Sequence, residues 1–207
     1  MDKLLIFDQD GTIIDSFPAF YMAMKAACMK YGKSLDNSFV KHKIGTHGSK
    51  EILKAVLPDK IEVLHKEYSD LLKNFDNYRK VYPKVIPTLK ILKSDFHIVM
   101  VTAKSTEKAI YHCKNLHIDH LFEKILGSPL YGKQDQIQML TNEYNVKRKN
   151  CVMIGDSITD MRSAKKAGIK TILCLYGYGK KTPELLSLGD KQVNSFSEIP
   201  MKVSELC

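Results

Sequence analysis

Short apolar runs recur along the chain, and two of them end in acidic residues. Leu4-Leu5-Ile6-Phe7 leads into Asp8 and Asp10, and Cys151-Val152-Met153-Ile154 leads into Asp156. Continuous apolar runs of this length are typical of strands that are buried on both faces, as in a parallel sheet. Because ligands of open α/β sheets bind at the carboxyl ends of the strands, the pattern predicts a site where these acids meet.

Strand and helix patterns alternate from Val81 to the C-terminus. Further strands are predicted at residues 97–101, 124–126 and 170–175, with a short edge strand at Val193. Helices are predicted at residues 86–92, 105–113, 134–144 and 160–167, the last closed by Gly168. This alternation predicts an α/β fold with a doubly wound parallel sheet that helices cover on both faces.

A different pattern fills residues 16–80, which show helical periodicity without a strand. Helices are predicted at 17–30, 50–56 and 61–75. A crossover between parallel strands needs only about a dozen residues, so this much longer segment is an insertion. The sequence therefore predicts a core domain of residues 1–15 and 81–207, and an inserted, all-helical cap domain of residues 16–80.

Composition narrows the class of protein. Of the 207 residues, 44% are hydrophobic and 27% are charged, which is typical of a soluble globular protein. No apolar run approaches the roughly 20 residues of a membrane helix, and the five cysteines are widely spaced and odd in number, so we expect a cytoplasmic protein with reduced thiols. The net charge of +9 comes from scattered lysines, which argues against a nucleic-acid partner.

Four motifs occur in order: FDQDGTIIDS, VMVTAKS, GSPLYGKQDQI and VMIGDSITDMRSAKKAGIKTI. Together they resemble the haloacid dehalogenase superfamily of phosphohydrolases, and within it the phosphoglycolate phosphatase-like branch with a helical cap. The resemblance implies a Mg²⁺-dependent phosphatase that hydrolyses a small phosphomonoester through an aspartyl-phosphate. Phosphoglycolate, a nucleotide or a sugar phosphate would each fit, and the protein would act as a monomer or homodimer.

The resemblance also implies roles for the acids. Asp8 would be the nucleophile and a metal ligand, and Asp156 would be a second carboxylate ligand. Asp10 would bind the metal through its backbone carbonyl and act as general acid and base through its side chain. Asp160 would bind the metal through a water molecule or hold the neighbouring loop. Gln9 departs from the family pattern, which often has an apolar residue there.

Residues from the two middle motifs complete the expected site. The hydroxyl of Thr102 and the amide of Ala103 would bind a phosphoryl oxygen, with Lys104 beside them in the substrate site. Lys133 would neutralise the nucleophile and the transferred group. Lys124 is the competing candidate, because the residue after Lys133 is not the proline that usually follows this lysine.

One cap segment, Gly45-Thr46-His47-Gly48-Ser49-Lys50, is rich in glycine and polar side chains. Such a turn at the start of a helix can present amides to an anion, so Gly45, His47 and Lys50 are expected to reach the substrate. The alternative is an ordinary loop between helices.

Other functions remain as alternatives. A phosphomutase of the β-phosphoglucomutase type would use the same residues if water were excluded from the site. A non-enzymatic interaction protein would be plausible only if Asp8 or Asp156 were missing. A D-x-D glycosyltransferase would not need Thr102, Lys133 and Asp156, and a phosphoacceptor signalling domain would not need the cap insertion.

Overall fold

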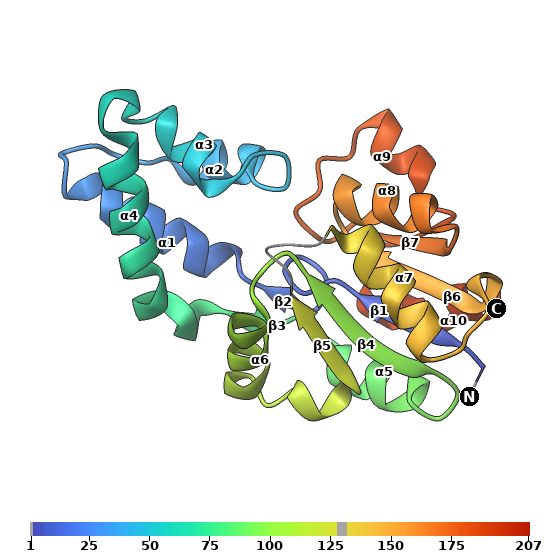
Figure 1. Cartoon of the computed structure of the whole chain (residues 1–207). Helices are drawn as coiled ribbons and strands as arrows, with labels where there is room; N and C mark the ends of the chain where they lie inside the picture. The colour runs from blue at the N-terminus through green and yellow to red at the C-terminus, as the bar shows by residue number, and fades with distance from the viewer. Residues whose placement is uncertain (1, 128–131) are drawn as a thin grey trace.

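The protein, analysed as a computed structural model, is described for residues 2–127 and 132–207, so residues 128–131 of the GSPLYGKQDQI motif lie outside the described part. One sheet of six parallel strands runs in the order β5-β4-β1-β6-β7-β8 (Figure 1). The strands are β1 (Leu4–Phe7), β4 (His97–Thr102), β5 (Lys124–Gly127), β6 (Cys151–Gly155), β7 (Lys170–Cys174) and β8 (Lys191–Val193). Strand β1 lies between β4 and β6, with Phe7 opposite both Met100 and Ile154.

Strand β1 is buried on both sides because its side chains alternate between two hydrophobic clusters. Leu5 and Phe7 belong to the cluster that includes residues of α5 (Val85–Leu92), α6 (Thr106–Asn115) and α10 (Ile199–Ser204). Leu4 and Ile6 belong to the cluster formed with α7 (Lys133–Glu143) and α8 (Ile158–Ala167). The predicted doubly wound α/β sheet is therefore confirmed.

The helix ends follow the expected capping chemistry. The Ser157 side chain accepts from the Asp160 amide at the start of α8, and Gly168 closes that helix in the left-handed conformation with φ of 72°. Ser105 caps α6 in the same way. Two further short helices, α9 (Pro183–Leu188) and α10, lie outside the predicted elements, because they span too few residues to show a helical period.

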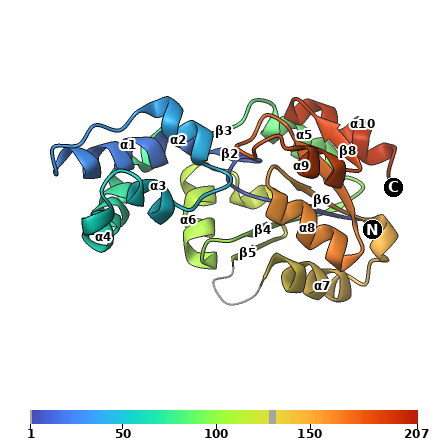
Figure 2. The ribbon, with the colours of Figure 1, turned by 90° about the horizontal axis from the view of Figure 1, so that it is seen from above.

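The inserted segment forms a separate group of helices beside the sheet (Figures 1 and 2). These are α1 (Phe17–Met29), α2 (Asn37–Lys43), α3 (Ser49–Lys54) and α4 (Ile61–Leu72), with 3₁₀ turns at Pro58–Lys60 and Lys73–Tyr78. They share a hydrophobic cluster of their own. Helix α2 was not predicted, and the helix predicted for 61–75 ends at Leu72 and continues as a 3₁₀ turn.

A two-stranded ribbon joins the cap helices to the sheet. Strand β2 (Ile14–Asp15) pairs in antiparallel fashion with β3 (Lys80–Val81), so both connections run side by side. The prediction that residues 16–80 contain no strand is wrong at Lys80, because a strand of two residues carries no detectable period. Among the described residues, no helix is long and apolar enough to cross a membrane.

Because Ile6 is fully buried at the centre of the sheet, Ile6→Ala is expected to lower the free energy of unfolding by about 2–5 kcal/mol. The matched control is Ile91→Ala, since Ile91 is 65% exposed on α5, and its effect should stay within about 0.5 kcal/mol. Urea denaturation followed by circular dichroism measures both. Equal losses for the two variants would contradict the assigned core.

Candidate active site

Three buried carboxylates meet at the carboxyl end of the sheet. Asp8 follows β1, Asp156 follows β6, and Asp160 lies in the first turn of α8. One carboxylate oxygen of each lies within 4.8 Å of the others. Gly11, with φ of 84°, lets the chain turn away after β1, and a Cβ atom there would clash with the Asp156 carboxylate.

Among the described residues, one lysine pairs with this acidic cluster. The Lys133 ammonium, at the start of α7, donates to Asp8 Oδ1 at 2.5 Å and also pairs with Asp160. Burial opposes its charge, but Asp160 and Asp8 together raise the pKa of Lys133, so the ammonium stays charged. Lys124 instead pairs with Glu143 at 2.6 Å on the surface, at the start of β5.

The three carboxylates carry more negative charge than Lys133 can balance. Burial raises the pKa of Asp8 to about 7, although Lys133 opposes the shift, and burial together with Asp8 raises the pKa of Asp156 well above its ordinary value. Within residues 2–127 and 132–207, no lysine or arginine pairs with Asp156. An oxygen-only donor set with surplus negative charge fits a hard divalent cation such as Mg²⁺.

Both carboxylate oxygens of Asp160 accept hydrogen bonds from other groups of the protein. Its Oδ2 accepts from the Ser157 amide at 3.0 Å and the Ser157 hydroxyl at 2.7 Å, while Oδ1 accepts from Lys133. A Cβ atom at Gly155 would clash with the Asp160 side chain, so the end of β6 is shaped around this acid. Of the two roles predicted for Asp160, these contacts favour holding the neighbouring loop over binding the metal through a water molecule.

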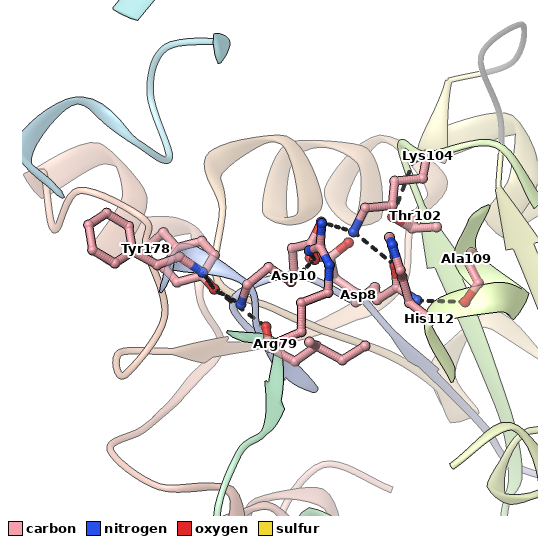
Figure 3. A network of polar contacts seen from close by, with 12 residues as sticks. Asp8, Asp10, Arg79, Thr102, Lys104, Ala109, His112 and Tyr178 are labelled. Atoms are coloured by element: carbon pink, nitrogen blue, oxygen red, sulfur yellow. Dashed lines mark hydrogen bonds and ion pairs between the residues drawn. The ribbon is translucent and has the colours of Figure 1, made fainter. Parts of the chain in front are cut away.

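Asp10 lies in a different environment, surrounded by donors (Figure 3). Its Oδ1 accepts from the Ser16 hydroxyl at 2.5 Å and lies 3.9 Å from Arg79 Nη1, and its Oδ2 pairs with Lys104. Burial alone would raise the pKa of Asp10, but Lys104, Ser16 and Arg79 outweigh burial and lower it. Asp8 and Asp10 thus lie two residues apart along the chain, and their surroundings shift their pKa values in opposite directions.

The expected phosphoryl-binding residues lie at the end of β4. Thr102 is buried there, and its Oγ1 accepts from the Lys104 amide at 3.4 Å; Ala103 is exposed between the two. The Lys104 ammonium reaches back to Gln9 Oε1 at 3.0 Å as well as to Asp10. Gln9 is fully buried and donates to the Ala109 carbonyl at 3.1 Å, so this departure from the family pattern connects β1 to α6.

Arg79, which sequence reasoning missed, is part of the site. Its side chain is buried, and Nε donates to Asp76 Oδ1 at 2.9 Å while Nη1 faces Asp10. His112 lies 3.6 Å from the same Asp76, and burial together with Arg79 and Lys104 lowers the pKa of His112 to about 4. The sequence signal was weak, because Arg79 precedes β3 in a polar stretch that is typical of a solvated linker.

The structure separates the expected cap residues. Gly45 packs against the backbone carbonyl of Tyr178, in the loop that follows β7. His47 is exposed and its Nδ1 lies 2.8 Å from Thr46 Oγ1. Lys50 pairs with Glu62 at 2.6 Å within the cap. Of the three, Gly45 is placed at a contact between cap and core.

Fold and site together define an enzyme of the doubly wound α/β class, with an acidic centre beside a helical cap. The chain belongs to the haloacid dehalogenase-like hydrolases, whose family model matches residues 5–174. It is 34% identical over 200 residues to a phosphoglycolate phosphatase of Psychrobacter arcticus, covering 86% of each chain. The protein is thus an enzyme, a hydrolase of the phosphatase type.

Solved structures share the whole fold. A haloacid dehalogenase-like hydrolase from Streptococcus pneumoniae superposes with a TM-score of 0.86 at 24% identity, covering 97% of each chain. A protein assigned as a β-phosphoglucomutase from Thermotoga maritima superposes with a TM-score of 0.80 at 21% identity, covering 99% of this chain and all of that one. At these identities, the likeness concerns the fold.

The raised pKa of Asp8 predicts a pH-dependent cost of folding without metal. The folded protein keeps a proton on Asp8 up to about pH 7, whereas the unfolded chain loses it near the ordinary aspartate pKa of 3.8, so rising pH removes stability between these values. In EDTA, Asp8→Asn should therefore become more stable than the parent as pH rises from 4 to 7, and Mg²⁺ should reduce the difference. Urea denaturation at several pH values measures it, and a pH-independent difference would contradict the assignment.

Proposed function

We propose that the protein is a Mg²⁺-dependent phosphatase that hydrolyses a small phosphomonoester metabolite through an aspartyl-phosphate on Asp8. The observation that carries this proposal is the contact of Lys133 with Asp8, inside a buried group of three carboxylates whose negative charge Lys133 balances only in part. The named activity of the Psychrobacter relative supports a substrate of the phosphoglycolate type. A nucleotide or a sugar phosphate also fits the proposal.

In the first half-reaction, an Asp8 oxygen attacks phosphorus and the bond to the leaving-group oxygen breaks. Lys133 holds Asp8 and balances charge on the transferred group, and Thr102 with the Ala103 amide donates hydrogen bonds to a phosphoryl oxygen. Asp8 and Asp156, with the backbone carbonyl of Asp10, would hold Mg²⁺. When bound, the ion offsets the repulsion between the carboxylate and the phosphate.

Asp10 serves both half-reactions as proton donor and acceptor. It gives a proton to the leaving oxygen and then takes one from the water that attacks the aspartyl-phosphate, which restores Asp8 and releases inorganic phosphate. Ser16, Lys104 and Arg79 fix the orientation of the Asp10 carboxyl. We propose no catalytic role for Asp160 beyond holding Lys133 and the loop after β6.

The proposed partner is one small phosphorylated metabolite, without nucleic acid, and the proposed compartment is the cytoplasm. A monomer or a homodimer is compatible with the site. Selection of the substrate is assigned to the cap, where Gly45, His47 and Lys50 stay predicted contributors.

A phosphomutase is the second candidate, because the fold of the Thermotoga protein assigned as a β-phosphoglucomutase is closely similar. A mutase returns the phosphoryl group from Asp8 to a second position of the substrate, whereas a phosphatase passes it to water. Release of inorganic phosphate therefore separates the two.

The test of the proposed function is phosphate release from a panel of phosphorylated metabolites, with Mg²⁺ and with EDTA. We expect Mg²⁺-dependent release from at least one small phosphomonoester, and none from Asp8→Asn, because that substitution removes the nucleophile. Circular dichroism should show the same fold for both proteins. Isomerised sugar phosphate without phosphate release would favour the mutase, and turnover by pure Asp8→Asn protein would refute the covalent mechanism.

The lysine assignment predicts unequal effects of two substitutions. Lys133→Ala should lower kcat by about 10²-fold or more, because it removes the ammonium that contacts Asp8. Lys124→Ala is the matched control and should stay within several-fold of the parent, since Lys124 pairs with Glu143 on the surface. Steady-state phosphate release measures both, and the reverse ranking would move the assignment to Lys124.

A further inference from the structure

The loop after β7 holds one of the proposed metal ligands through its backbone. The amides of Tyr178 and Gly179 donate to Asp156 Oδ2 at 2.6 Å and 3.1 Å. A Cβ atom at Gly177 would clash with the Asp156 side chain and with the Gly11 carbonyl, so the loop and the turn after β1 close tightly around this acid. The position of the Asp156 carboxylate therefore depends on the position of residues 177–179.

The other end of Tyr178 holds the connection to the cap. Its hydroxyl accepts from the Ser16 amide and from the Phe17 amide, the latter at 2.8 Å, and it donates to Asp15 Oδ1 at 3.0 Å. Asp15 ends β2, and Phe17 begins the first cap helix. In Figure 3, Tyr178 lies on the opposite side of Asp10 from Lys104 and Thr102.

Tyr178 also contributes to the capping of α1. The first amides of a helix lack partners within it and are commonly bound by the side chain of the N-cap residue. Ser16 is the N-cap residue of α1, but in the described structure its side chain makes no capping hydrogen bond, because its hydroxyl is bound to Asp10. The Phe17 amide donates instead to the Tyr178 hydroxyl at 2.8 Å, from across the interface between core and cap, and to Asp15 Oδ1 at 3.2 Å.

A third contact joins Tyr178 to the cap loop that follows α2. Gly45, with φ of 87°, packs against the Tyr178 carbonyl so closely that a Cβ atom would clash with it. In Figure 1, the loop after α2 points toward the loop between β7 and α9. One residue of the core thus touches both the base of the cap and the loop after α2, and also holds the Asp156 carboxylate.

We propose that Tyr178 is a positioning residue that couples cation binding at Asp156 to the placement of the cap. The inference rests on the proposed Mg²⁺ site. A cation that orders Asp156 also orders the 177–179 backbone bound to it, and through the Tyr178 hydroxyl it orders the first turn of α1. Because coupling between two sites is reciprocal, the cap contact must strengthen cation binding by the same factor by which the cation strengthens the cap contact.

The test uses Tyr178→Phe, which removes the hydroxyl and leaves the backbone amide that binds Asp156. The matched control is Tyr176→Phe. Tyr176 lies two residues earlier in the same loop and donates to the Thr12 carbonyl at 3.0 Å, and none of its described hydrogen bonds reaches Ser16 or Phe17. Both variants lose one partly buried hydroxyl, but Tyr178→Phe loses at least three hydrogen bonds and Tyr176→Phe loses one, so Tyr178→Phe should lose more thermal stability. The response to Mg²⁺, and not the loss of stability, therefore tests the coupling.

Two measurements on the whole protein, without substrate, decide the matter. Amide hydrogen exchange by NMR should show that Mg²⁺ slows exchange at Ser16 and Phe17 in the parent and in Tyr176→Phe, but not in Tyr178→Phe. Calorimetry should show that Mg²⁺ binds Tyr178→Phe at least about 5-fold more weakly than it binds the parent, with Tyr176→Phe unchanged.

The failures can be told apart. The inference is wrong if Mg²⁺ binds the parent without slowing amide exchange at Ser16 and Phe17. It is also wrong if Tyr178→Phe binds Mg²⁺ as tightly as the parent does. In either case Tyr178 only stabilises the structure. If Mg²⁺ does not bind the parent at all, the proposed function falls, and the coupling falls with it.

Discussion

Repulsion among buried carboxylates is the constraint on which the rest of this structure depends. Asp8, Asp156 and Asp160 lie within 4.8 Å of one another where water cannot screen them, a costly arrangement. Lys133 and the backbone amides of the loop after β7 offset part of that cost. The remaining surplus of negative charge is what makes the centre a candidate for a divalent cation.

The two acids that follow β1 differ because the protein surrounds them differently. Asp8 faces other acids, and burial raises its pKa to about 7. Asp10 faces Lys104, Ser16 and Arg79, which lower its pKa. Their separation along the chain is only two residues, so their opposite environments come from different elements. Lys104 follows β4, Ser16 opens the cap, and Arg79 lies where the chain returns from it.

The base of the cap is therefore built into the site. Ser16 contacts Asp10, and Arg79 faces the same carboxyl, at the two ends of the cap insertion. The β2–β3 ribbon keeps these ends adjacent. Movement of the cap relative to the sheet would change the surroundings of Asp10. The hydrogen bonds from the start of α1 to the Tyr178 hydroxyl oppose such a movement.

The sequence by itself determined the doubly wound sheet and the strand ends that carry Asp8 and Asp156, because buried parallel strands show as apolar runs followed at once by polar residues. It also showed that residues 16–80 are too long for a crossover. Only the tertiary structure decided that Lys133, not Lys124, lies against Asp8, since local patterns do not specify which distant side chains meet. Tyr178 escaped sequence reasoning for the same reason: its partners are about 20 residues away at Asp156 and about 160 away at Ser16.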